Sequence, residues 1–254
     1  MFDAQPQQAP RPPGADFTTA LFARIGLDRY TVGSCVLGAV YLGWSARGVS
    51  AVRLTAAHGA ADEFADWYHE RTGRRIVPAV ELDTIARAAQ AKLADSSAAD
   101  VPVDLDLATP LERDVFARVR EIRAGYARPC ELIARELGAG CTPQSVADVL
   151  TNNAVPLLIP CHRVVREDRC CGGYVFGDDA QQQLLAAEGL DPSAVDRAIE
   201  RGYRYIENDG WFCLPTCGSI AVHLDAPGYA GLRSLDEVRA RGLRACGSCR
   251  PLAA

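Results

Sequence analysis

The spacing of hydrophobic residues along this 254-residue chain predicts strands near its start. Between residues 18 and 54, short apolar runs are broken by glycine and polar residues. Two of these runs, 39–45 and 49–54, flank Ala46-Arg47-Gly48, which is the pattern of a β-hairpin. The stretch 94–108, rich in Ala, Ser and Asp, is then expected to connect this first lobe to a second one.

Apolar residues at helical spacing predict helices over six segments: 59–71, 81–93, 109 to about 123, 129–137, 143–150 and 178–188. Thr109, Pro110 and Glu112 give the third of them a capping box with proline at the first helical position. The fourth and fifth are joined by a short glycine-containing turn, so they form a candidate DNA-binding helix-turn-helix, with an ordinary helical hairpin as the alternative. A polar stretch from Asp191 to Asp196 is expected to lead into the cysteine-rich end.

Composition and charge narrow the class of protein. Apolar residues make up 48% and charged residues 23% of the chain, as in globular proteins, which excludes a disordered chain, a collagen and a coiled coil. The longest near-apolar stretch, 35–44, is too short to span a bilayer, and no secretory signal is visible, so we expect a cytoplasmic protein without a membrane partner. A net charge of −5 argues against a non-specific nucleic-acid coat protein.

Ten cysteines without a secretory signal indicate a reducing compartment, where cysteines are more often metal ligands, nucleophiles or core residues than disulfides. Cys161 stands alone in Pro160-Cys161-His162-Arg163, directly after the apolar run 155–160. A nucleophilic cysteine needs a lowered pKa, and the neighbouring His162 and Arg163 are side chains that can provide it. On this adjacency alone, a purely structural cysteine is the alternative.

A longer string favours the nucleophile. Residues 153–165, Asn-Ala-Val-Pro-Leu-Leu-Ile-Pro-Cys-His-Arg-Val-Val, closely resemble the active-site signature of the methylated-DNA-protein-cysteine methyltransferases, the O6-alkylguanine-DNA alkyltransferases. Gly173-Tyr174 and residues 184–189 also look like that family. The resemblance covers roughly residues 17–190 and implies an α/β fold, with an N-terminal ribonuclease-H-like lobe and a helical alkyltransferase lobe that carries the helix-turn-helix.

The resemblance implies DNA repair by a suicide methyltransferase. The helix-turn-helix would enter the minor groove of alkylated DNA, and the damaged guanine would be flipped into a pocket. Cys161 would take the alkyl group from O6 and would not be regenerated. His162 would act through a water as the base for the thiol, Glu188 would orient His162, and Asn153 would support the helix-turn-helix and the active-site turn.

The resemblance also indicates the substrate-binding residues and departures from the family pattern, two of which are Phe176 and Gln181 at positions usually small and basic. Tyr174 would help to hold the base, and Val164 and Arg163 are expected beside it. The other departures, in an alignment without gaps from Cys161, are Gln144 at the arginine that fills the space of the flipped base, Cys130 at a tyrosine, and Asp148 at a small glycine. Because a carboxylate near phosphates opposes binding, a damage sensor or a thiol scavenger of alkylating agents stays open as an alternative.

Four further cysteines form two close pairs near the C-terminus. Cys213-x-x-x-Cys217 and Cys246-x-x-Cys249 are separated by 28 residues, and four thiolates so spaced can close a tetrahedral zinc site. The sequence around both pairs resembles the metal-binding domain of the Ada repair-protein family. That resemblance implies a structural zinc and, at Cys213, a zinc thiolate that accepts methyl groups from DNA methylphosphotriesters.

These observations predict a monomer whose partner is DNA. We expect four parts: a disordered tail (1–15), an N-terminal α/β lobe (16–100), an alkyltransferase domain for DNA binding and catalysis (105–192), and a small Ada-like zinc-binding domain (200–254). The last part has too few residues for a secure core, so metal binding is expected to supply part of its folding free energy.

Overall fold

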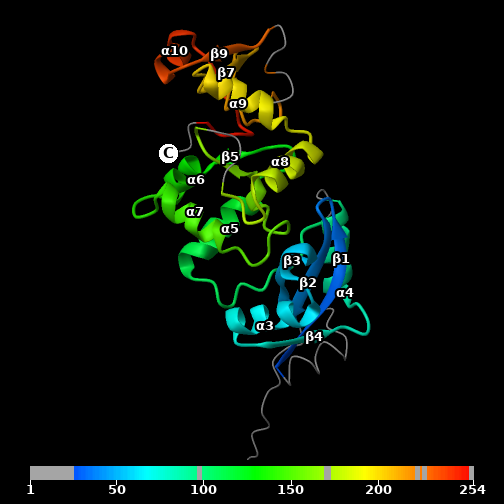
Figure 1. Cartoon of the computed structure of the whole chain (residues 1–254). Coiled ribbons are helices and arrows are strands. Elements are labelled where there is room, and N and C mark those ends of the chain that lie inside the picture. Colours follow the sequence, from blue (N-terminus) through cyan, green and yellow to red (C-terminus); the bar gives the residue numbers. More distant parts are fainter. Residues whose placement is uncertain (1–25, 96–98, 169–172, 221–223, 225–227, 252–254) are drawn as a thin grey trace, which may run out of the picture.

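The computed structural model describes residues 26–95, 99–168, 173–220, 224 and 228–251. The tail expected over 1–15 lies outside these residues. Along the chain, the described elements form a sheet with flanking helices, a helical lobe and a small C-terminal group of strands (Figure 1). Among the described residues, no helix is long and apolar enough to cross a membrane.

The first group is a four-stranded sheet with three helices. The strands lie in the order β3-β2-β1-β4, and only the β1–β4 pair is parallel. The predicted hairpin is confirmed, and the predicted helices begin two to three residues later than expected. The bounds are β1 (Leu27–Cys35), β2 (Gly38–Ser45), β3 (Gly48–Leu54), α2 (Thr55–His58), α3 (Ala61–Thr72), β4 (Arg75–Pro78) and α4 (Thr84–Ala94).

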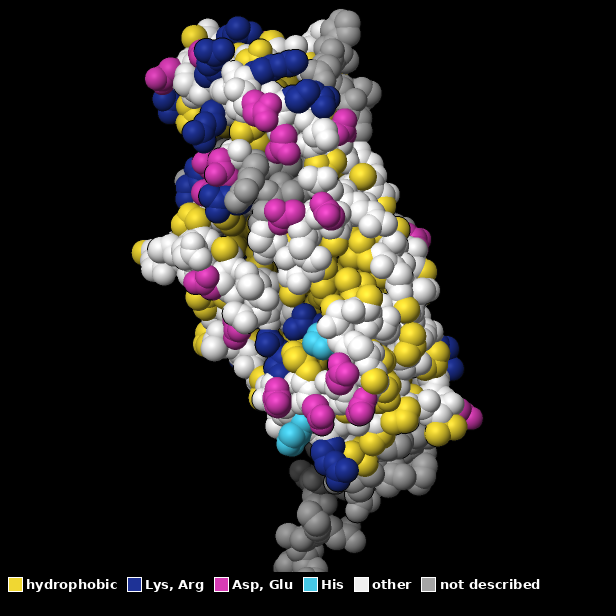
Figure 2. All heavy atoms as spheres, in the orientation of Figure 1, with side chains coloured by type: hydrophobic (Ala, Val, Ile, Leu, Met, Phe, Trp, Pro, Cys, Tyr) yellow, Lys and Arg dark blue, Asp and Glu magenta, His cyan; other side chains and the backbone are white. Residues whose placement is uncertain are grey.

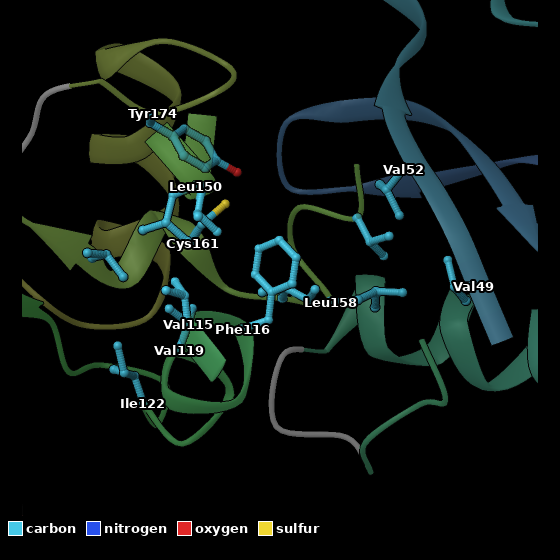
Figure 3. Close-up of a cluster of buried hydrophobic side chains, with 14 of the residues drawn as sticks. Val49, Val52, Val115, Phe116, Val119, Ile122, Leu150, Leu158, Cys161 and Tyr174 are labelled. Carbon is cyan, nitrogen blue, oxygen red and sulfur yellow. The ribbon is translucent and has the colours of Figure 1, made fainter. Parts of the chain in front are cut away.

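Both faces of the sheet carry apolar side chains that pack against helices. On one face, Tyr41 of β2 stacks on Phe64 of α3, with ring centroids 4.7 Å apart. On the other face, Leu42 and Trp44 join a core that passes through α4 into the helical lobe and includes Cys161 (Figure 3). Because both lobes share this core, the segment around Cys161 is fixed by packing from two sides.

The helical lobe matches the predicted pattern closely. Thr109 and Glu112 form the expected capping box of α5, and Thr142 caps α7, but α5 ends at Arg120 rather than near 123. The helix-turn-helix candidate consists of α6 and α7. The bounds are α5 (Pro110–Arg120), β5 (Arg128–Pro129), α6 (Cys130–Leu137), α7 (Pro143–Thr151), the 3-10 turn η1 (Cys161–Arg163), β6 (Val164–Val165) and α8 (Asp178–Ala187).

The polar stretch 191–196 is not merely a passage to the cysteine-rich end, because it begins a helix. Asp191 caps α9 (Pro192–Glu200) through the backbone N–H of Ala194, and Val195 packs on Leu185 of α8. Beyond α9, strands lie in the order β10-β8-β7-β9. The bounds are β7 (Tyr205–Asn208), β8 (Trp211–Cys213), β9 (Ala230–Leu232), α10 (Leu235–Ala240) and β10 (Arg244–Ala245).

The first lobe contains a buried polar cluster that gives a test of its stability. Asp83 is 4% exposed. It accepts hydrogen bonds from Ala86 N at 2.9 Å, Arg29 Nη2 at 2.5 Å and Trp44 Nε1 at 3.0 Å. Asp83→Ala therefore removes a helix cap and leaves the guanidinium buried without this partner, so we expect a loss of about 3–5 kcal/mol of unfolding free energy.

Asp191→Ala is the matched control, because it removes an exposed cap of the same kind from α9. Its expected cost is about 1 kcal/mol. Urea unfolding followed by far-ultraviolet circular dichroism measures both variants. Equal losses would show that the buried ion pair adds nothing beyond the cap.

Candidate active site and metal centre

Cys161 lies on a short, heavily hydrogen-bonded turn. It opens η1, and its backbone N–H donates to Ile159 O at 2.7 Å. The following strand, β6, pairs in parallel with β5. Gln181 of α8 reaches the same turn from the other side, because its Nε2 donates to His162 O at 3.0 Å and to Val164 O at 2.9 Å. The backbone that carries the thiol is therefore held by two elements besides its own.

Asn153 connects the end of α7 to the sulfur. It is fully buried, and its Nδ2 donates to Cys161 Sγ at 3.1 Å and to Ile159 O at 3.3 Å. Its Oδ1 accepts from Val155 N at 2.9 Å. The next residue, Ala154, accepts a backbone hydrogen bond from Val52 of β3. The first lobe thus holds Ala154, the residue directly after Asn153, whose side chain contacts the thiol.

A buried pair lies next to Cys161. His162 Nε2 is 3.1 Å from Glu188 Oε1. A carboxylate only accepts, so Nε2 carries the proton and Nδ1 of the neutral ring is an acceptor. Nδ1 is buried and has no hydrogen-bond partner among the described residues. The ring is therefore oriented with its basic nitrogen available inside the protein.

The guanidinium of Arg163 holds the same carboxylate. Its Nε and Nη2 donate to the two oxygens of Glu188 at 2.9 and 2.6 Å, and its Nη1 donates to Ile122 O at 2.6 Å. Arg163 was expected beside the substrate. The structure instead places its guanidinium on Glu188, and neither Arg163 nor His162 is among the residues that line the cavity described next.

The cavity at the sulfur has a volume of about 570 Å³ and lies between α6, α7 and the segment after β6. Of the predicted substrate residues, Tyr174, Val164 and Gln144 line it together with Cys161. The ring of Tyr174 meets that of His162 edge-on at 6.1 Å, and its buried hydroxyl has no hydrogen-bond partner among the described residues. Figure 3 shows Tyr174 and Cys161 close together at this site.

The environment sets the protonation of the three central groups. Burial raises the pKa of Cys161 to about 11, against the opposing effects of the Asn153 hydrogen bond and the charge of Arg53. Burial lowers the pKa of His162 and outweighs its interactions with Glu188. Burial acts to raise the pKa of Glu188, but hydrogen bonds from His162 and Arg163 hold it at about 2. At neutral pH the site therefore contains a thiol, a neutral imidazole and a carboxylate, and the thiol needs a base.

Arg53 is a charged group at this site that the sequence pattern did not reveal. It lies on β3, and its guanidinium stacks over Trp67 of α3 at 4.3 Å from the ring centroid. Its charge lowers the pKa of the Cys161 thiol. In the sequence, an arginine in the apolar run 49–54 was the only signal, and nothing there connects it to a cysteine more than a hundred residues away.

The four C-terminal cysteines come together. The Sγ atoms of Cys213, Cys217, Cys246 and Cys249 all lie within 4.8 Å of one another. A tetrahedron with zinc–sulfur bonds of about 2.3 Å would place them ~3.8 Å apart, so the cluster has the size that the metal requires. Leu214 N donates to Cys249 Sγ at 3.4 Å, which favours a thiolate there. The donor set therefore fits a tetrahedral zinc site.

Residues 110–190 match a family model described as the DNA-binding domain of 6-O-methylguanine DNA methyltransferase. Over these residues, which we call the methyltransferase domain, the chain is similar to that family. The methyltransferase domain so defined contains Cys161, His162 and Glu188, which confirms the resemblance found in the sequence.

Curated relatives agree with the match. The methylated-DNA–protein-cysteine methyltransferase of Methanothermobacter thermautotrophicus is 38% identical over 95 residues, which cover 35% of this chain and 53% of that protein. Ada of Escherichia coli, a bifunctional transcriptional activator and DNA repair enzyme, is 28% identical over 167 residues, 63% of this chain and 45% of Ada. The chain thus spans about half the length of the curated relatives it matches.

A solved structure shares the fold. The crystal structure of Mycobacterium tuberculosis O6-methylguanine methyltransferase matches with a TM-score of 0.51 and 21% identity, over 63% of this chain and 92% of that one. At this identity the match shows the fold alone. It confirms the mixed α/β class expected from the sequence.

The side chains around the cavity do not form a typical phosphate-binding surface. α7 carries no lysine or arginine, and Gln144 donates from Nε2 to Asp148 Oδ1 at 2.8 Å. Glu131 of α6 also lines the cavity. This part of the methyltransferase domain, which we call the acidic rim (Glu131, Gln144 and Asp148), therefore presents carboxylates, which oppose phosphate binding. Among the described residues that line the cavity, only Arg166 carries a cation.

The cysteine cluster outside the methyltransferase domain gives a direct test. We expect one tightly bound zinc per chain in the wild type and none in Cys246→Ala, because loss of one thiolate opens the tetrahedron. Cys130→Ala is the control, since Cys130 is buried and is not one of the four clustered cysteines. Elemental analysis of the purified proteins measures the zinc content per chain. Equal zinc in the wild type and Cys246→Ala would remove Cys246 from the site.

Proposed function

We propose that this protein repairs DNA by transferring an alkyl group irreversibly from O6 of an alkylated guanine to Cys161, in keeping with relatives named methylated-DNA–protein-cysteine methyltransferase. The observation that carries the proposal is the cavity with a cysteine sulfur on its wall and a buried His–Glu pair directly behind it, inside a methyltransferase domain. The S–C bond forms as the C–O6 bond breaks. The electron pair of the broken bond stays on the guanine, which takes up a proton.

The residues around the sulfur would have separate roles in activating the thiol. His162 would take the thiol proton at Nδ1 through a water, because its Nε2 is committed to Glu188. Glu188 would stabilise the imidazolium that forms, and Arg163 would fix Glu188 rather than contact substrate. Asn153 would stabilise the developing thiolate through its hydrogen bond to the sulfur.

The binding of DNA is part of the proposal. The helix-turn-helix α6–α7 would lie in the minor groove, and a flipped guanine would enter the cavity against Tyr174 and Val164. We assign the first lobe, 16–100, as ribonuclease-H-like because helices cover both faces of its mixed sheet, and 105–192 as the alkyltransferase domain. We expect the protein to act as a monomer.

The C-terminal part, 200–254, is proposed to be an Ada-like zinc-binding domain. Cys213, Cys217, Cys246 and Cys249 would hold the metal. Zinc bound there would keep the thiols deprotonated while leaving them nucleophilic. Cys213, the residue matching the acceptor of the Ada family, would take methyl groups from phosphotriesters.

A second candidate function follows from the acidic rim. Carboxylates at the cavity mouth oppose duplex DNA but do not hinder a small neutral or cationic electrophile. The protein would then sense alkylation damage or scavenge alkylating agents with the same thiol. The chemistry at Cys161 is common to both functions, and the source of the alkyl group distinguishes them.

The decisive experiment is intact mass spectrometry after mixing with duplex DNA that contains O6-methylguanine. We expect one methyl group per chain at Cys161, located by peptide mapping, and none in Cys161→Ser, whose hydroxyl is far less acidic than a thiol. Cys35→Ser is the control for the loss of a half-buried thiol elsewhere. Methylation by a small alkylating agent but not by DNA would favour the scavenger. Full uptake by Cys161→Ser would refute the assignment.

Gln144 gives a second prediction. Gln144→Arg adds a cation that can fill the stack left by the flipped guanine and pair with nearby phosphates. Recovering ~1.4 kcal/mol of the cost of extrusion would raise the single-turnover rate on duplex DNA about tenfold. Gln182→Arg is the matched control, because it makes the same change at an exposed position of α8 that does not line the cavity. An unchanged duplex rate in Gln144→Arg would show that the missing arginine does not limit the protein.

A further inference from the structure

The segment between α5 and β5 contacts the active site on one side. We call residues Ile122–Ala127 the bridging segment. Ile122 O accepts from Arg163 Nη1, and Gly125 N donates to Glu188 Oε2 at 3.4 Å. Gly125 has a φ of +79°, and a Cβ there would lie 2.9 Å from Glu188 O. The bridging segment therefore lies against both the side chain and the backbone of Glu188.

The same segment contacts the cysteine cluster on its other side. We call residues Thr216–Ser219, which include Cys217, the metal knuckle. Ala127 N donates to Thr216 O at 3.0 Å, and the Tyr126 hydroxyl lies 3.0 Å from Ser219 Oγ. Gly218 fits so tightly that a Cβ on it would lie 2.2 Å from Gly125 O. The knuckle thus rests directly on the residue whose N–H reaches Glu188.

We propose that the metal knuckle is a positioning element for the reaction at Cys161. The path runs from Cys217 and Gly218 to Gly125, then to Glu188 and His162, and each step is a close contact between buried or half-buried groups. The inference rests on the proposed function for the role of His162. It adds that the C-terminal module is part of the scaffold that sets the basicity of that ring.

Simple docking of two independent domains is the opposing interpretation. Ion pairs also join the module to the methyltransferase domain, Arg250 with Glu121 and Glu136, and Arg204 with Glu167. In each pair the arginine is exposed, at 43% for Arg250 and 61% for Arg204, and such pairs contribute little. The contacts at Gly218 are different in kind. They are close backbone contacts between half-buried residues, and closely packed groups transmit small displacements rather than absorb them.

Gly218→Ala tests the proposal, because its methyl group must displace Gly125. Gly247→Ala is the matched control, since a Cβ at Gly247 meets nothing within 4 Å and the residue lies in the same module. Zinc content and thermal unfolding are measured for both. The functional readout is the pH profile of Cys161 modification by iodoacetamide, quantified by peptide mass spectrometry, alongside methyl transfer from DNA.

We expect Gly218→Ala to retain zinc, to lower both rates about tenfold, and to move the acid limb of the profile to lower pH. The direction follows because Glu188 raises the pKa of His162, so a weakened pair leaves the ring less basic. Glu188→Gln gives the reference shift in the same direction, and Gly247→Ala should behave as the wild type. An unchanged rate and profile in folded, zinc-containing Gly218→Ala would overturn the proposal.

Two further outcomes keep the hypotheses separate. If Gly218→Ala does not fold, chelation of zinc from the wild type replaces it: a shifted iodoacetamide profile at an unchanged fold of residues 110–190 supports the positioning role, and an unshifted profile overturns it. If the wild type takes no methyl group from DNA while the iodoacetamide profile still responds to Gly218→Ala, the proposed function fails and the coupling stands.

Discussion

The carboxylate of Glu188 accepts hydrogen bonds from His162 Nε2, from Nε and Nη2 of Arg163 and from the backbone of Gly125. A buried carboxylate is expensive unless such donors surround it. Its four donors come from the turn η1 and from the bridging segment, and Glu188 itself closes α8. The position of this one charge therefore depends on three parts of the chain, and each of them is held in turn by it.

The reactivity of Cys161 depends on that arrangement. Burial keeps the thiol protonated, so its nucleophilic form has to be generated by proton transfer. Glu188 fixes which nitrogen of His162 can accept the proton, and burial keeps the ring neutral and ready to do so. The first lobe contributes as well, through the hydrogen bond from Val52 to Ala154 and through the charge of Arg53. The active site is thus a product of the whole fold, although the reacting atoms lie on one turn.

The sequence predicts the local features of this protein well. Thr109 caps its helix as expected, because capping involves only residues three positions apart. The adjacency of Cys161 and His162 and the spacing of the C-terminal cysteines are likewise visible in the chain. The sequence analysis did not predict helix α9, because the stretch where it begins is polar. Asp191 followed by Pro192 is nevertheless a helix-start signal.

Long-range contacts set the limit of that prediction. Arg163 follows Cys161 by two positions in the chain, and only the fold shows that its side chain faces Glu188 and Ile122. The same holds for Gly125 and Gly218, which no pattern in the sequence distinguishes from the other glycines. Their importance comes from their close approach, because a Cβ added to Gly218 would lie 2.2 Å from Gly125 O. No local pattern encodes such an approach.

The distribution of charge places two requirements of the proposed repair reaction in different parts of the molecule. The methyltransferase domain would supply the thiol and its base, but its acidic rim offers no cation on α7. Arginines gather instead over the C-terminal module at the top of Figure 2, with acidic side chains among them. In this module Arg244 stacks on the exposed ring of Trp211, 4.2 Å from its centroid, and Trp211 precedes Cys213 by two residues. Phosphate attraction requires such side chains. A module that both presents cations and rests on the segment behind Glu188 can therefore bring together DNA attraction and thiol activation, which α7 alone does not.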